Sequence, residues 1–129
     1  MERSINFRGI AINPFDGWVY GNLLKLTDSV TEITTWYIAY ETGEKIAVRP
    51  ETVGQHTGLR DSRGIDIYEG GIVQWADEGN IYTGTVFWSD DSYGWRIQMP
   101  KGYMPSFKLL AKHTELIGNI YENHNLLTT

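Results

Sequence analysis

The chain has 129 residues, a length that fits one compact unit or two small lobes that share a core. Its net charge is −5, from 16 acidic and 11 basic residues, so it lacks the basic excess that supplies most of the affinity of non-specific nucleic-acid binders. It has no cysteine, which excludes disulfides and thiolate metal sites, and no apolar run near the roughly 20 residues of a membrane-spanning helix, so we expect a soluble, cytoplasmic protein without a membrane partner.

The first part of the chain predicts strands separated by turns. Between the first two strands, the segment Asn13-Pro14-Phe15-Asp16-Gly17 favours a hairpin, because proline presets φ and glycine accepts a positive φ. Pro50 interrupts the pattern, and one helical turn is expected over residues 51–54. We therefore divide the chain into an N-terminal β subdomain, residues 1–56, and a second lobe, residues 57–129. The strands predicted in the first lobe are residues 7–12, 18–26, 34–40 and 45–48.

The second lobe continues in the same manner. Ser106 is expected to cap a short helix over residues 107–112, and residues 123–129 are expected to form a partly ordered tail. Short, evenly spaced strands rich in aromatic residues indicate a mainly β protein built as small barrels or rolls. The strands predicted here are residues 72–76, 81–88, 95–99 and 116–121.

Six separated blocks of the sequence stand out in order: Phe7-Arg8-Gly9, Gly17-Trp18-Val19-Tyr20-Gly21, Pro50 to Gln55, Thr57-Gly58-Leu59, Ile67-Tyr68-Glu69-Gly70 and Leu116 to Asn123. Together they resemble the YopX-like family of phage and prophage proteins. The resemblance implies an N-terminal β subdomain followed by a C-terminal SH3-like barrel or roll, in a bacterial host, and it brings no settled biochemical role. One departure is that Gly71 stands where the family usually has Asp, which favours a structural role for this motif, since glycine fits most turns.

The acidic residues do not form a convincing catalytic or metal-binding pattern. Asp61, Asp66 and Glu69 lie within nine residues but lack the spacing of a calcium loop, and the adjacent pair Asp90 and Asp91 reads as part of a turn. The chain has no nucleophile elbow and no phosphate loop, and its three histidines have no ligand spacing. We therefore expect no enzyme activity, no catalytic residue, no metal and no cofactor.

Aromatic residues of the second lobe are the better candidates for function. We predict a partner-binding surface formed by Tyr93, Trp95, Arg96 and Tyr103, because exposed aromatic side chains beside a basic one suit peptide grooves. The competing interpretation is that Trp88 and Trp95 are core residues of two paired strands, since burial is the commonest use of an aromatic ring.

The predicted function is a non-enzymatic protein-interaction module whose partner is a host or phage protein or another copy of the chain. The alternative is a small nucleic-acid-binding protein that uses the same aromatic and basic face to stack bases. A hydrolase that uses Asp61, Asp66 or Asp90 ranks below both.

Overall fold

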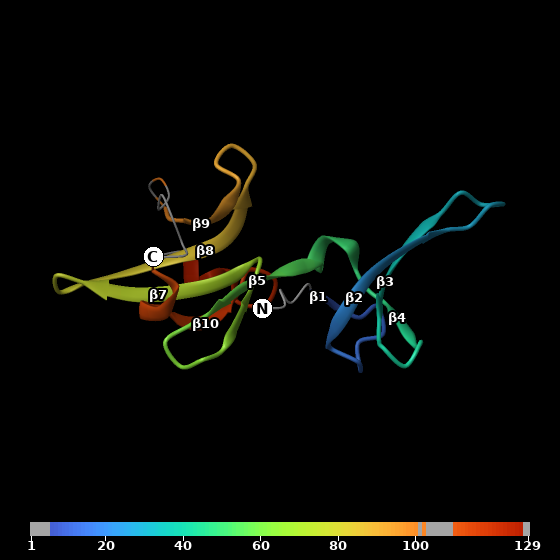
Figure 1. Ribbon diagram of the computed structural model, residues 1–129, viewed down its shortest axis with the longest axis horizontal. Coiled ribbons are helices and arrows are strands. Elements are labelled where there is room, and N and C mark those ends of the chain that lie inside the picture. The colour runs from blue at the N-terminus through green and yellow to red at the C-terminus, as the bar shows by residue number, and fades with distance from the viewer. Residues whose placement is uncertain (1–5, 101, 103–109, 128–129) are drawn as a thin grey trace. The chain divides into compact units, whose positions relative to one another are not determined.

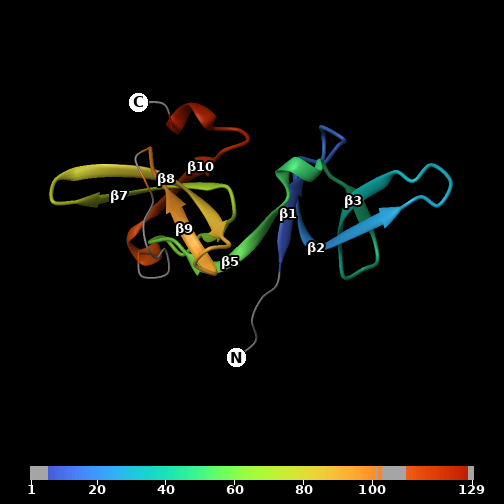
Figure 2. The ribbon, with the colours of Figure 1, turned by 90° about the horizontal axis from the view of Figure 1, so that it is seen from above.

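A computed structural model of the chain describes residues 6–100, 102 and 110–127 (Figures 1 and 2). The protein is mainly β, with antiparallel strands arranged in two sheets, as the sequence predicts. Two compact units divide the chain, Met1–His56 and Thr57–Thr129. None of the helices in the described ranges is long and apolar enough to span a membrane.

The first unit is an antiparallel sheet in which β2 is the longest strand. β2 pairs with β1 through residues 18–21 and with β3 through residues 22–27, so its two halves have different neighbours. Val19, Ile38 and Val48 form the buried core of this unit. Its elements are β1 (Phe7–Ile10), β2 (Trp18–Thr27), β3 (Thr34–Ala39), β4 (Lys45–Ala47), the 3₁₀ helix η1 (Pro50–Thr52) and the start of β5 (Gly54–Arg60).

The second unit is built around the β7–β8 hairpin, which the yellow segments of Figure 1 mark. Its four-stranded sheet has the order β10-β7-β8-β9, and the core beneath it contains Ile67, Val73 and Ile97, all fully buried. The elements are β6 (Asp66–Tyr68), β7 (Gly71–Asp77), β8 (Asn80–Ser89), β9 (Gly94–Gln98), η2 (Ala111–His113), β10 (Glu115–Asn119) and η3 (His124–Leu127).

Gly84 shows why this sheet needs a glycine inside a strand. A Cβ built on Gly84 would lie 2.3 Å from Ile97 Cγ2 and 2.9 Å from the carbonyl oxygen of Gln98, distances that no real side chain tolerates. The missing side chain lets β9 approach β8 closely and gives Ile97 the space to be fully buried.

The structure confirms the predicted strands, with ends that shift by a few residues, and it corrects three details. β5 and β6 were not predicted as strands, because neither segment carries a clear alternation of apolar and polar residues. Of the expected helix, the described part is η2, and Ser106 and residues 107–109 lie outside the described residues. The closed SH3-like barrel is not found in the described part of the chain: β10 pairs with β7 and β9 with β8, which leaves an open sheet.

Candidate partner-binding surface

Trp88 and Trp95 face each other across the β8–β9 hairpin. The strand register pairs them directly, and their rings make an edge-to-face contact with centroids 5.3 Å apart and planes at 76°. The next pair on the same face, Val86 and Ile97, is fully buried, and Trp95 packs against the same core. Trp88 keeps 40% of its surface exposed. Trp95 is therefore the core-facing member of this pair, and Trp88 is the surface-facing member.

The turn after Trp88 presents a second aromatic ring and two carboxylates. Tyr93 is 84% exposed and holds a φ of 50°, in the left-handed region. The indole Nε1–H of Trp88 donates a hydrogen bond of 3.1 Å to Asp90 Oδ1, and both Asp90 and Asp91 are exposed. The Ser92 hydroxyl and the Ser89 hydroxyl lie 2.9 Å apart and close the turn. We call Trp88, Asp90, Asp91 and Tyr93 the turn surface.

The structure does not place all four predicted surface residues together. Trp95 and Arg96 are adjacent on β9, so pleating directs them to opposite faces of the sheet, and Arg96 pairs across the strand with Phe87. The guanidinium of Arg96 donates a 2.9 Å hydrogen bond to the Trp95 carbonyl oxygen. Tyr103 lies outside the described residues. The exposed rings are therefore accompanied in the turn by the carboxylates of Asp90 and Asp91, which the sequence had assigned only to a turn. The Arg96 guanidinium lies beside Gly94, where a Cβ would be 2.9 Å from Arg96 Nη1.

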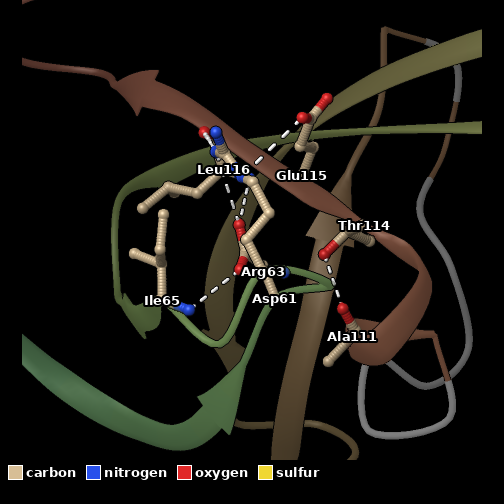
Figure 3. Close-up of polar contacts among 7 residues, drawn as sticks. All are labelled: Asp61, Arg63, Ile65, Ala111, Thr114, Glu115 and Leu116. Carbon is tan, nitrogen blue, oxygen red and sulfur yellow. Dashed lines mark hydrogen bonds and ion pairs between the residues drawn. The ribbon is translucent and has the colours of Figure 1, made fainter.

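Asp61, the first of the acids considered for catalysis, is buried and engaged by backbone amides (Figure 3). Its Oδ1 accepts hydrogen bonds from the amides of Arg63 at 2.8 Å and Ile65 at 2.9 Å, and its Oδ2 accepts one from Leu116 at 2.9 Å. Burial by itself raises the pKa of Asp61, but the three amides and the nearby Arg63 guanidinium outweigh burial and hold the pKa below its ordinary value. This carboxylate is ionised and both of its oxygens accept backbone hydrogen bonds, which indicates a structural role.

Arg63 adds further contacts between the turn of residues 61–65 and β10, which the Asp61–Leu116 hydrogen bond already connects. Its Nη2 donates a 2.8 Å hydrogen bond to the Leu116 carbonyl oxygen, and its Nε lies 3.7 Å from a Glu115 carboxylate oxygen (Figure 3). Beside it, the Thr114 hydroxyl donates to the Ala111 carbonyl oxygen at 2.8 Å, and the Ser62 amide donates to the Thr114 carbonyl oxygen. Side-chain and backbone hydrogen bonds thus connect residues 61–65 with residues 111–116.

The blocks that carry the family resemblance in this unit contact each other directly. Asn119 pairs with Gly71 in the β7–β10 ladder, and the Ile120 amide donates to the Gly70 carbonyl oxygen at 3.0 Å. Gly70 has a φ of +87°, and a Cβ there would lie 3.2 Å from the Tyr121 ring. The glycines and polar residues of these blocks therefore stabilise the pairing of β10 with β7.

Asp66 and two surface hollows lie apart from the turn surface. In residues 6–100, 102 and 110–127, no three side chains of the types His, Cys, Asp and Glu are placed to hold a metal. Asp66 pairs with Arg60 at 3.1 Å on the surface. Two open hollows, of about 180 Å³ and about 490 Å³, lie along residues 81–83 with 126–127 and along residues 20–22 with 39–41, and neither is lined by the turn surface.

Comparison with known proteins establishes the family. A solved structure with a similar fold is the crystal structure of protein EF1440 from Enterococcus faecalis, with a TM-score of 0.57 and 18% sequence identity, covering 98% of this chain and 99% of that one. At that identity the likeness shows the fold alone. No curated protein matches the sequence. The sequence model described as YopX protein matches residues 15–128, and the chain therefore belongs to the YopX family.

Proposed function

We propose that the chain is a non-enzymatic protein-interaction module that binds its partner through the turn surface. In keeping with the family resemblance, we place it among phage or prophage proteins that act in the cytoplasm of a bacterial host. The observation that carries the proposal is Tyr93, a large aromatic side chain that is 84% exposed on a left-handed backbone.

The conformation of Tyr93 is unfavourable for the free protein. A non-glycine residue in the left-handed region costs about 1–2 kcal/mol, and a bulky aromatic residue is uncommon there. Burial of the ring could offset this cost, but the ring is almost fully exposed. Glycine or asparagine would serve the turn better, as they would at Glu32 and Glu78, which are also exposed and left-handed. Tyr93 differs from these two because it presents a large aromatic ring, and this exposed ring supports a role in partner contact.

The acids considered for catalysis support a non-enzymatic role. Asp61 is fully engaged by backbone amides, Asp66 forms a surface ion pair with Arg60, and Asp90 accepts the indole N–H of Trp88. The nucleic-acid alternative loses support, because Asp90 and Asp91 beside the exposed rings would repel phosphates.

The proposal is tested by affinity capture from bacterial lysate, with and without nuclease, using wild-type protein and a Tyr93→Gly variant. We expect the variant to lose the protein partner while its melting temperature stays equal or rises, since glycine relieves the left-handed strain. Phe15→Ala is the matched control, because Phe15 is an equally exposed aromatic residue (95%) in the first unit, and this variant should retain the partner.

Two results would contradict the proposal. Capture of the same partners by Tyr93→Gly and wild-type protein would remove the turn surface from binding. Loss of every specific partner after nuclease treatment would indicate nucleic-acid binding instead.

A further inference from the structure

We infer that the turn surface receives a cationic side chain, arginine or lysine, from a protein partner. This inference rests on the proposed function and adds the chemistry of the partner. Exposed aromatic rings alone would accept many apolar partners, so the argument depends on the charges that accompany them.

The charge distribution of the chain is uneven around this surface. Residues 64–95 contain no lysine or arginine and six acidic residues, so this segment has a charge of −6, whereas the rest of the chain is close to neutral. Two of the six, Asp90 and Asp91, are exposed within the turn surface itself. A partner of positive charge is therefore the complementary one, and a partner rich in carboxylates or phosphates would be repelled.

The nearest basic residue in the sequence, Arg96, projects from the face of the hairpin opposite to Trp88, and its guanidinium lies beside Gly94. The Nη1 of Arg96 donates to the Trp95 carbonyl oxygen, and within the described residues no ion pair joins Arg96 to Asp90 or Asp91. In the described part of the chain, the charge of Arg96 is thus not paired with either carboxylate.

The geometry at Trp88 combines the two features that bind a cation. The hydrogen bond from its Nε1 fixes the Asp90 carboxylate 3.1 Å from the edge of an indole ring that is 40% exposed. Tryptophan is the best aromatic acceptor for a cation above its ring, and a neighbouring carboxylate adds direct attraction. Tyr93 supplies a second exposed ring in the same turn.

The first unit shows that this chemistry is used elsewhere in the same chain. The Lys25 ammonium lies 4.0 Å from the centroid of the Trp36 ring, and the Arg8 guanidinium lies 4.2 Å from that of Trp18. In those pairs the chain supplies both the cation and the ring. At the turn surface it supplies the rings and the carboxylates, and the cation is the part that a partner would bring.

The test is a titration of ¹⁵N-labelled full-length protein with a capped Gly-Arg-Gly-Arg-Gly peptide and with the same peptide carrying citrulline, which is similar in shape but neutral. The indole N–H signal of Trp88 and the amide signal of Tyr93 report on the site. We expect the arginine peptide to shift both signals with an affinity about threefold to fivefold higher than that of the citrulline peptide, a ratio that falls as salt is added.

A double variant, Asp90→Asn with Asp91→Asn, should abolish the preference for arginine. Asp77→Asn with Glu78→Gln is the control, because it removes the same charge from the β7–β8 turn at the other end of β8 and should leave the preference intact. Equal binding of the arginine and citrulline peptides, or a preference that survives the Asp90 and Asp91 changes, would overturn the inference.

The outcomes separate this inference from the proposed function. If partner capture depends on Tyr93 but the two peptides bind alike, the interaction module stands and the cationic partner is wrong. If capture is indifferent to Tyr93, the proposed function fails whatever the peptides do.

Discussion

Replacement of Asp61 by Asn should destabilise the second unit because it removes one buried acceptor. An asparagine side chain keeps one oxygen, which can still accept the amides of Arg63 and Ile65, but it turns an NH₂ group towards the Leu116 amide, which donates to Oδ2 in the wild-type protein. A part-buried donor left without an acceptor, together with the loss of charge on the remaining bonds, costs roughly 2–3 kcal/mol.

Urea unfolding followed by amide spectra measures this cost separately in each unit. With a slope of about 2 kcal/mol per molar urea, the midpoint of the second unit should fall by roughly 1 M, while that of the first unit stays unchanged. The exchange rate of the Leu116 amide should rise in the same variant, because its acceptor is gone.

The pH dependence gives an independent signature of Asp61. Its folded-state pKa lies below the ordinary value of 3.8, because the three amide hydrogen bonds and Arg63 together outweigh burial. A lowered folded pKa contributes stability above the unfolded pKa, and this stability is lost as pH falls through the folded pKa. Wild-type protein should therefore lose more stability below about pH 4 than Asp61→Asn does. Asp28, whose pKa is lowered by hydrogen bonds from Thr31 and Val30, leaves both proteins some acid sensitivity.

Asp66→Asn is the matched control, because Asp66 is exposed and pairs with Arg60 at the surface. Its change in unfolding free energy should stay below about 1 kcal/mol. Equal destabilisation by Asp61→Asn and Asp66→Asn, or acid unfolding curves of wild type and Asp61→Asn that run parallel, would refute the structural role assigned to Asp61.

Two further predictions concern the core of the second unit. Ile67→Ala should lower the unfolding free energy by about 2–5 kcal/mol, since Ile67 is fully buried, whereas Ile81→Ala, at a site that is 72% exposed, should change it by less than about 0.5 kcal/mol in the same urea titration. Gly84→Ala should cost about 1–3 kcal/mol and lower the melting temperature, because the new methyl group would overlap Ile97 and Gln98; an unchanged melting temperature would show that β9 can move away freely.

Local patterns in the sequence predicted most of the strands, because alternation and turn residues act over short distances. The 81–88 segment, for example, carries Tyr82, Gly84, Val86 and Trp88 at alternate positions, and the register places them along one face of β8. The same local logic could not show that the second sheet stays open. Closure of a barrel depends on which strands meet at the edges, and the pairing of β10 with β7 rests on residues more than forty positions apart.

The candidate site was only partly predictable, for a similar reason. The sequence identified the aromatic residues near Trp88 and the turn that follows, but it grouped Trp95 with Arg96, which the strand pleat separates. The left-handed backbone of Tyr93 had no signal in the sequence, since glycine or asparagine is the usual marker of such a position. The engagement of Asp61 by Leu116 was equally hidden, because the two residues are 55 positions apart.

That separation bears on how the second unit reaches its native state. The Asp61 carboxylate and the Leu116 amide can meet only after a loop of more than fifty residues has closed, and the entropy of closure must be lost before the hydrogen bond forms. β7 and β8, by contrast, are joined by a tight turn and can pair early. Until β10 arrives, the outer edge of β7 presents unpaired backbone groups on a strand whose Ile72, Val73 and Trp75 are apolar. Once β10 has paired with β7, the hydrogen bond from Leu116 to Asp61 helps to hold it there, so that this edge stays covered against aggregation.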